Sequence, residues 1–436
     1  MKLRPSFLIS LSFFLIILTG AVFLCLPVSS AKGTFTNFLD AYFTSNSATC
    51  VTGLVTLDTG THFTLFGQII ILILMQIGGL GYMTFSAFFV LLLKKKMFIS
   101  ERLMVQEAMN VYSSRETVNV LKRIFLVVFV IEAAGAIILF LRWLPEFGLS
   151  KALFWGIFHS VSAFNNAGFA LPANFANLSP YVTDIIINLS ITSLIILGGI
   201  GFFVLSDVFF ARKFSLHSKI VLSATAFLII SATLAFLFLE YSNPNTIGGL
   251  GFGNKVMASY FQAVTPRTAG FNTINEAVLT PASLIITMFL MFIGASPGGT
   301  GGGVKTSTFA VIAATIRATL RGLKDTVIYR RRIPHEIVRR AFTITTLACM
   351  VVITAILFLE HFTQFNLMES GFEVFSAFGT VGLSMGITPK LSGIGKMIII
   401  VVMFIGRVGP LTMALSLLLQ HKEPRIEYPK ENISIG

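Results

Sequence analysis

Eight stretches of roughly 20 apolar residues dominate this chain of 436 residues. An α-helix of about 20 apolar residues is long enough to span the hydrocarbon core of a bilayer. The stretches cover residues 7–26, 64–93, 124–141, 182–211, 220–240, 282–320, 341–359 and 397–419. Only 12% of the residues are charged and the mean hydropathy is +0.84, whereas a soluble domain carries about 25% charged residues. The sequence therefore predicts an all-α membrane protein in which only the sixth stretch is interrupted.

Basic residues lie mainly at the two ends of the chain and in alternate connections between the apolar stretches. They cluster at residues 2–4, 94–123, 212–219, 317–340 and 422–430. By the positive-inside rule, both termini and the three long connections are expected in the cytoplasm. The net charge of +13 is then explained by topology and by anionic membrane lipids, so no nucleic-acid partner is expected.

The four outer segments between the spans share one pattern. Each opens with a half-length amphipathic stretch and ends in a glycine motif: TCVTGL, FNNAGF, PRTAGF or FGTVGL, aligned on Gly53, Gly168, Gly270 and Gly382. A second glycine motif follows in the next span as QIGGLGYM, ILGGIGFF, FIGASPGG or FIGRVGPL. Recurring motifs at similar offsets indicate four copies of one unit: span, half-helix with glycine loop, span.

The repeat predicts how the chain is organised. The expected segments are a first repeat at 1–96, a cytoplasmic amphipathic connection at 97–123, a second repeat at 124–213, a third repeat with a broken second span at 214–323, a cytoplasmic connection at 324–338, a fourth repeat at 339–420 and a cytoplasmic tail at 421–436.

Irregular backbone inside a membrane must be buried in protein or line a wet cavity. Four glycine loops can turn main-chain carbonyls toward one axis, where the carbonyls replace the hydration shell of a cation. No loop places Asp or Glu beside its glycine, which favours a monovalent ion over Ca²⁺. These observations predict a cation pathway at the centre of the four repeats.

The motifs SATCVTGL, SAFNNAGF, TPRTAGFNT and SAFGTVGL, together with GGTGGG, resemble the Trk/Ktr/HKT superfamily of potassium-translocating subunits. Since the chain starts directly with the first repeat, the resemblance is closer to the bacterial KtrB membrane subunits. It implies four pseudo-repeats of helix, pore half-helix with filter loop, and helix around one central pore. It also implies channel-like inward K⁺ flux across the inner (plasma) membrane of a bacterium. The single glycine per loop leaves Na⁺ permeation or dependence open.

The resemblance assigns site residues position by position. Carbonyls of the K⁺ filter are expected from Val51, Thr52, Gly53, Asn166, Ala167, Gly168, Thr268, Ala269, Gly270, Thr380, Val381 and Gly382. No other metal site is expected. Arg267, inside the third motif, is expected to point away from the axis and to hold loop carbonyls.

The stretch GASPGGTGGGVKTST in the sixth span resembles a phosphate-binding loop at first sight. Its lysine, however, comes one position late, and an apolar span precedes it in place of a soluble βα unit. The resemblance instead implies an intramembrane gate. The gate residues are expected to be Ala295, Gly298, Gly299, Gly301, Gly302, Gly303, Lys305 and Arg407. For Lys305 the alternative is a position at the cytoplasmic water boundary, and for Arg407 it is a structural pair with a buried acid or with carbonyls. Gly78–Gly81 and Gly198–Gly201 are interpreted as close-packing sites between helices.

Two other classes of function are less favoured. A secondary cation or solute symporter is also built from repeats, but usually from inverted pairs, whereas these four copies share one orientation. An enzyme would need a catalytic arrangement within the spans, and the sequence offers none. The resemblance implies a homodimer and a cytoplasmic ring of KtrA-type nucleotide-binding regulators. No cofactor is expected in this chain; K⁺ is the substrate, and a role of Na⁺ as activating or coupling ion stays open.

Overall fold

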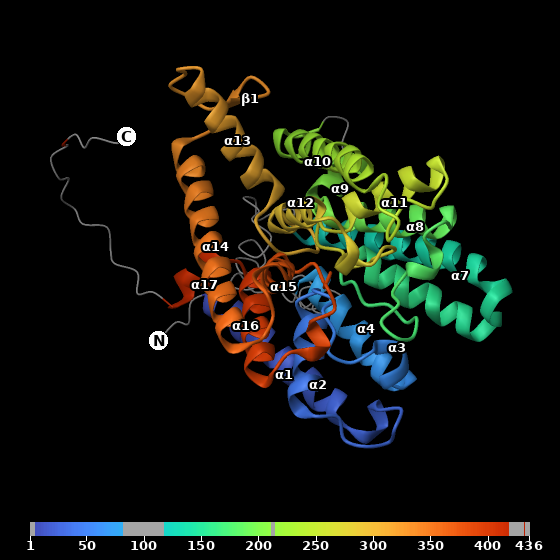
Figure 1. Cartoon of the computed structure of the whole chain (residues 1–436). Helices are drawn as coiled ribbons and strands as arrows, with labels where there is room; N and C mark the ends of the chain where they lie inside the picture. Colours follow the sequence, from blue (N-terminus) through green and yellow to red (C-terminus); the bar gives the residue numbers. More distant parts are fainter. Residues whose placement is uncertain (1–4, 82–116, 211–213, 418–430, 432–436) are drawn as a thin grey trace.

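The computed structural model describes residues 5–81, 117–210, 214–417 and 431. Within these residues the chain is helical apart from loops and one small antiparallel hairpin, formed by β1 (Val327–Ile328) and β2 (Arg331–Arg332). Figure 1 shows this hairpin at one end of the molecule, beside α13, with α2 and α3 at the opposite end. Of the predicted cytoplasmic connection at 97–123, residues 97–116 lie outside the described residues and residues 117–123 form the start of a long helix. The predicted tail at 421–436 lies outside the described residues except for residue 431.

Two sets of helices follow the predicted repeat. Long helices open the four units: α1 (Pro5–Cys25), α7 (Thr117–Phe164), α10 (Leu216–Glu240) and α14 (His335–Phe362). Shorter helices come next: α2 (Phe38–Thr49), the part of α7 after its non-helical residue Gly148, α11 (Phe252–Val264) and α15 (Leu367–Gly379). The C-terminal residues of α2 and α15 are buried, so these shorter helices end inside the protein.

A third set of helices follows each glycine loop and is broken in more units than the sequence predicted. It comprises α4 (Leu65–Leu80), α8 (Ile185–Gly199) with α9 (Phe202–Phe210), α12 (Pro281–Phe292) with α13 (Thr306–Leu320), and α16 (Gly393–Val408) with α17 (Pro410–Leu417). The expectation of continuous spans over 182–211 and 397–419 is wrong. Gly201 and Gly409 have φ values of +96° and +94°, which a right-handed helix cannot accommodate, and α9 bends from α8 by 102°.

Side-chain caps fix where the third set begins. The hydroxyl or carboxylate of the N-cap residue accepts a main-chain N–H of the first turn at Thr64, Asp184, Thr280 and Ser392. Such caps satisfy donors that the helix itself cannot pair. The remaining short helices are η1 (Pro27–Ser29), α3 (Thr59–His62), η2 (Ser179–Tyr181), η3 (Glu276–Val278) and η4 (Thr388–Lys390).

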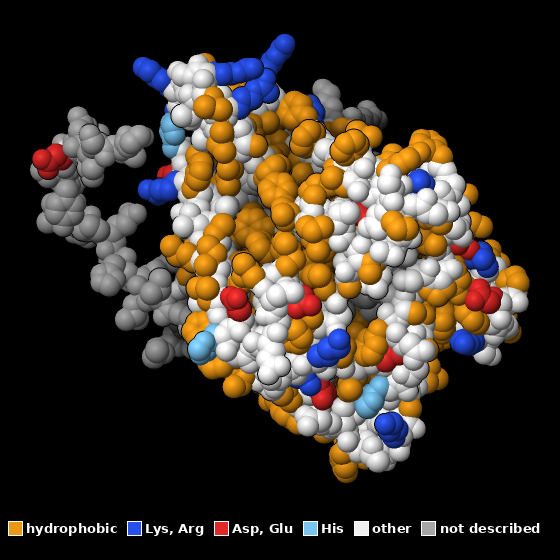
Figure 2. Space-filling model, viewed as in Figure 1, with side chains coloured by type: hydrophobic (Ala, Val, Ile, Leu, Met, Phe, Trp, Pro, Cys, Tyr) orange, Lys and Arg blue, Asp and Glu red, His pale blue; other side chains and the backbone are white. Residues whose placement is uncertain are grey.

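The outer surfaces of the long helices are apolar. By length and composition, α7, α10 and α14 can each cross a membrane, as can the bent pair α8–α9 taken together; α1, α4, α12 and α13 contribute shorter apolar helices, all within the described residues. In α14 only 22% of the most apolar window is buried within the chain. Figure 2 shows apolar side chains over much of the surface, with Lys and Arg gathered at the hairpin end. This distribution suits a protein embedded in lipid.

Glycines let the third set of helices pack against the ends of the shorter helices. A Cβ added at Gly78 would lie 2.0 Å from the carbonyl oxygen of Thr49, and one at Gly198 would lie 1.8 Å from that of Phe164. A Cβ added at Gly406 would lie 2.1 Å from the carbonyl oxygen of Phe378. These distances are too short for any side chain, so the close approach itself requires glycine.

Candidate functional site

The four predicted glycine loops share one backbone conformation. The residue two positions before each glycine is left-handed although it has a side chain, with φ of +51° at Val51, +56° at Asn166, +72° at Thr268 and +51° at Thr380. The glycines are left-handed too, with φ of +89° at Gly53, +72° at Gly168, +74° at Gly270 and +95° at Gly382. A left-handed non-glycine residue costs on the order of 1–2 kcal/mol, so four at equivalent positions indicate a shared structural demand.

The glycine loops contact one another in a closed ring. A Cβ added at each glycine would meet the carbonyl oxygen of the residue before the next glycine: Ala167 at 2.5 Å from Gly53, Ala269 at 2.8 Å from Gly168, Val381 at 2.2 Å from Gly270 and Thr52 at 2.2 Å from Gly382. The order of contacts follows the order of the repeats and returns to the first. The twelve predicted filter residues are therefore brought together in one place.

Hydroxyl groups from the preceding helices hold these loops. Ser47 and Ser376 accept the main-chain N–H of Gly53 and Gly382, each at 3.0 Å. The Ser162 hydroxyl donates to the carbonyl of Phe169 at 2.8 Å. The third loop has Val264 at the serine position, and Thr265 donates to the carbonyl of Phe271 in its place. Sequence reasoning missed Thr265, because it lies one residue out of register with the serines.

Two side chains of the loop motifs contact groups outside their own loop. The Asn166 amide contacts the Thr268 hydroxyl at 2.9 Å, which links the second and third loops. Arg267 is buried, and its Nη2 donates to the Thr225 hydroxyl of α10 at 3.3 Å. It does point backward, but it holds a helix hydroxyl, and the expectation that it holds loop carbonyls is wrong.

A buried carboxyl group stands behind the third loop. Nε2 of Gln262 in α11 donates to both carboxylate oxygens of Glu276, at 3.1 and 3.0 Å. Burial, together with the neighbouring charge of Glu240, raises the pKa of Glu276 to about 8, although the hydrogen bond from Gln262 acts in the opposite direction. This contact ties the segment that follows the third loop to α11.

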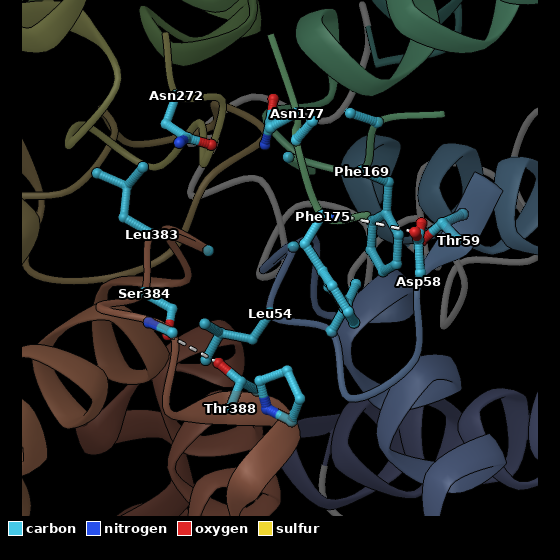
Figure 3. Close-up of a pocket in the computed structure, with 18 of the residues that line it drawn as sticks. Leu54, Asp58, Thr59, Phe169, Phe175, Asn177, Asn272, Leu383, Ser384 and Thr388 are labelled. Carbon is cyan, nitrogen blue, oxygen red and sulfur yellow. Dashed lines mark hydrogen bonds between the residues drawn. The ribbon is translucent and has the colours of Figure 1, made fainter. Parts of the chain in front are cut away.

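A cavity of about 560 Å³ opens on one side of the ring. Its lining includes Gly53, Gly168 and Gly382, together with Asp58, whose carboxylate lies five residues after Gly53. Figure 3 shows Leu54, Phe169 and Leu383 among the side chains around this space. The Asp58 carboxylate accepts main-chain N–H groups, including that of Gly60 at 3.1 Å, so its charge is already partnered.

The segment 293–305 lies on the other side of the ring and separates α12 from α13. An added Cβ at Gly301 would meet the Thr268 hydroxyl at 2.0 Å, and the N–H of Gly302 donates to the Thr380 hydroxyl at 2.8 Å. Thr300 donates through its hydroxyl to the carbonyl of Phe164 at 3.3 Å. The segment therefore sits directly against the residues that begin the second, third and fourth loops.

The breaks in the second and fourth units hold this segment at its two sides. Main-chain N–H groups of Ser296 and Thr300 donate to the carbonyls of Gly199 and Gly198, at 2.9 and 3.2 Å, and the N–H of Gly303 donates to that of Gly406 at 3.3 Å. The carbonyl of Gly298 accepts from Phe202 at 2.9 Å. The remaining predicted gate glycine lies nearby, since an added Cβ at Gly299 would be 2.9 Å from the Gly199 carbonyl, and Ala295 is buried.

Two cationic side chains complete the arrangement. Arg407 donates through Nη1 to the carbonyl of Thr300 and through Nη2 to that of Gly78, so it joins segment 293–305 to α4. Lys305 donates to the carbonyl of Gly301 at 2.7 Å. Both cations thus hold carbonyls of the segment. Within the described residues no group of three or more His, Cys, Asp or Glu side chains could hold a metal ion.

Comparison of the chain with known proteins identifies the family to which it belongs. Residues 7–428 match the family described as "TrkH: Cation transport protein". The chain belongs to this family of cation transporters. The family is not one of enzymes, and the resemblance drawn from the motifs is confirmed.

Relatives match this family member over nearly their whole length. It is 46% identical to the Ktr system potassium uptake protein B of Bacillus subtilis, over 100% of this chain and 97% of the relative. It is 40% identical to the potassium/sodium uptake protein NtpJ of Enterococcus hirae, over 100% and 98%. The Ktr system potassium uptake protein B of Vibrio alginolyticus is also 40% identical, over 98% and 94%.

A solved structure shares the fold. The crystal structure of the potassium transporter TrkH from Vibrio parahaemolyticus superposes with a TM-score of 0.78 and covers 96% of this chain and 86% of that chain. The sequence identity is 18%, so this match concerns the fold alone. Family and fold together make the chain an integral membrane protein.

Proposed function

We propose that this protein is the potassium-translocating membrane subunit of a Ktr-type uptake system. The observation that carries the proposal is the closed ring of four glycine loops, each with the same pair of left-handed residues. Alternating left-handed and ordinary residues turn successive carbonyls to one side, and such carbonyls can replace the hydration shell of K⁺. The names of the relatives as potassium uptake proteins support K⁺ as the ion.

In this proposal the four pseudo-repeats surround one central pore. The filter is made by the carbonyls of the twelve residues 51–53, 166–168, 268–270 and 380–382. The shorter helices end next to the ring, so their negative dipole ends favour a cation there. The 560 Å³ cavity is the outer vestibule, through which K⁺ reaches the filter.

Segment 293–305 is the proposed gate, with Lys305 and Arg407 as the side chains that hold it closed. It lies against Thr268 and Thr380 on the side of the ring opposite the vestibule, where it obstructs the path. Many of its contacts are hydrogen bonds that involve main-chain groups, which water in an open pore can replace. A phosphate-binding role does not fit this surrounding of helix breaks and filter residues.

The orientation and the partners form the second part of the proposal. The basic hairpin end is cytoplasmic, as are both termini, in the inner membrane of a bacterium. The subunit is a homodimer and binds a cytoplasmic ring of KtrA-type nucleotide-binding regulators. Support comes from the name "Ktr system" of two relatives and from the Lys and Arg side chains at that end (Figure 2).

One experiment separates this function from its alternative, a secondary symporter. Purified protein in vesicles is given a K⁺ gradient, with and without Na⁺, and K⁺ flux is recorded. Channel-like translocation predicts K⁺ flux down its gradient in the absence of Na⁺, which Na⁺ only modulates. Strict dependence of every K⁺ movement on Na⁺ movement would instead establish a symporter, in keeping with the name potassium/sodium uptake protein of one relative.

A further inference from the structure

A short segment of the second repeat, residues 172–178, runs along the vestibule and joins three of the repeats. At its start, the carboxylate of Asp58 from the first repeat accepts the main-chain N–H groups of Asn174 and Phe175, the latter at 3.3 Å. Figure 3 shows Asp58 facing Phe175 across this contact. We call residues 172–178 the strap.

At its other end the strap reaches the third repeat. Nδ2 of Asn177 donates to the carbonyl oxygen of Gly270 at 3.2 Å, and the N–H of Leu178 donates to the carbonyl of Asn272 at 3.1 Å. Gly270 is the glycine of the third loop, 93 residues away from Asn177. The strap therefore connects an anchor in the first repeat to a filter carbonyl in the third.

The strap backbone is strained in a way that needs this anchor. Asn174, Phe175 and Asn177 are all left-handed, with φ of +61°, +54° and +49°. Such residues persist only where surrounding contacts impose them, and phenylalanine has no local hydrogen bond to favour that conformation. The hydrogen bonds from the main-chain N–H groups of Asn174 and Phe175 to the Asp58 carboxylate restrain the strained residues directly.

The third loop receives a side-chain hydrogen bond from outside its own repeat. In the first and fourth loops a serine hydroxyl accepts the glycine N–H. In the second and third loops the hydroxyls of Ser162 and Thr265 donate to a carbonyl after the glycine instead, so neither holds the glycine N–H. Among the described residues, the glycine carbonyl that accepts a side-chain hydrogen bond is that of Gly270, whereas those of the other three loops accept none.

We propose that Asn177 is a positioning residue for ion selectivity, held in place by Asp58 through the strap. The inference rests on the proposed filter function. A carbonyl oxygen has two lone pairs, so Gly270 can accept from Asn177 and still face an ion. The smaller Na⁺ requires the carbonyls to close in further than K⁺ does, and a carbonyl tied to Asn177 resists that movement.

The test is the ratio of Na⁺ to K⁺ flux in vesicles containing the purified full chain. Asn177→Gly removes the amide yet keeps a left-handed backbone without steric cost. Loss of one hydrogen bond predicts a rise of the ratio by about three- to tenfold. Asn174→Gly is the matched control: it makes the same change in the same strap and leaves the N–H that binds Asp58, so the ratio should stay at the wild-type value.

A second variant of Asn177 and a double variant with Asp58 distinguish a specific loss of the hydrogen bond from a general loss of structure. Asn177→Asp keeps the side-chain size and the tolerance for positive φ but loses the donor, so it should raise the ratio as well. Asp58→Ala should raise the ratio, and Asn177→Gly should add little in the Asp58→Ala background. Fully additive effects, or wild-type ratios in both Asn177 variants, would overturn the inference.

Failure of the inference is distinguishable from failure of the proposed filter. Gly270→Ser is measured in parallel. If it changes K⁺ affinity or the flux ratio while the Asn177 variants do not, the filter stands and the role of the strap is refuted. If Gly270→Ser changes neither, in folded protein, then the third loop is not in the ion path and both proposals fall.

Discussion

The third and fourth units break their last helix at the same aligned motif, yet the two breaks differ in kind. In the fourth unit, FIGRVGPL, a single residue at Gly409 separates α16 from α17. In the third unit, FIGASPGG, residues 293–305 separate α12 from α13. A one-residue break changes the direction of a helix, whereas a thirteen-residue segment has main-chain groups of its own to pair.

The main-chain groups of the two breaks have different partners. Segment 293–305 bonds to the breaks of the second and fourth units and touches the loops at Thr268 and Thr380. Gly409 has open space beside it, since an added Cβ would meet only Thr412, at 3.8 Å. Arg407, next to the short break, reaches across to the long one. In the proposed function the long break is the obstruction, and the short break positions the arginine that contacts it.

Deleting residues 298–302 should produce the largest effect. The deletion removes the part of the segment that lies under the ring and leaves the glycine loops intact. K⁺ flux into vesicles, without any regulator, should rise on the order of tenfold or more, since several hydrogen bonds that hold the obstruction disappear. Reduced flux in protein that is still folded would show that the segment supports the pore instead of closing it.

Serine substitutions in the glycine loops should alter affinity without opening the pore. Gly270→Ser and Gly382→Ser place a Cβ 2.2 Å from a carbonyl oxygen and should raise the K⁺ concentration for half-maximal uptake by about tenfold. In Gly53→Ser and Gly168→Ser the added Cβ lies 2.5 Å and 2.8 Å from a carbonyl oxygen, so the loss of K⁺ affinity should be smaller in Gly53→Ser and smallest in Gly168→Ser. All four should also discriminate less against Na⁺. Normal affinity in all four variants at normal expression would remove the glycines from the ion path.

Arg407→Ala should raise flux in the same direction as the deletion but by less, about threefold to tenfold. It removes the contacts to Thr300 and Gly78 while the segment keeps its main-chain bonds. Arg407→Lys is the control, because it keeps the charge but cannot donate to both carbonyls at once. Its flux should lie between that of the wild type and that of Arg407→Ala. An unchanged flux in Arg407→Ala would assign the arginine to structure alone.

Gly409→Ala should have the smallest effect on flux, within about twofold of wild type. Its cost is backbone strain at a φ of +94°, on the order of 1–3 kcal/mol of folding stability, since the added methyl group meets open space. Thermal unfolding in detergent and flux per folded protein separate the two quantities. A rise in flux as large as that of the deletion would mean that the short break also obstructs the pore.

The primary structure determined the class of the protein and its repeat. Apolar stretches of membrane-spanning length, alternate basic connections and four aligned glycine motifs carry that information locally. Even the breaks could be anticipated in part, because the run of glycines in GASPGGTGGG is incompatible with a regular helix. The breaks at Gly201 and Gly409 were missed, since two or three glycines inside an apolar stretch are equally compatible with close helix packing.

Contacts between repeats were decided by the tertiary structure alone. Asn177 from the second repeat donates to a carbonyl of the third loop, and Asp58 from the first repeat accepts N–H groups of the strap; neither residue belongs to a motif. Thr265 takes the role of the aligned serines from one residue after their position, which Val264 occupies in the third loop. Arg267 pairs with a hydroxyl of α10. Periodicity and motif spacing report what a residue does within its own helix or loop. A hydrogen bond between residues 93 positions apart depends on how four separate units pack, which no local pattern encodes.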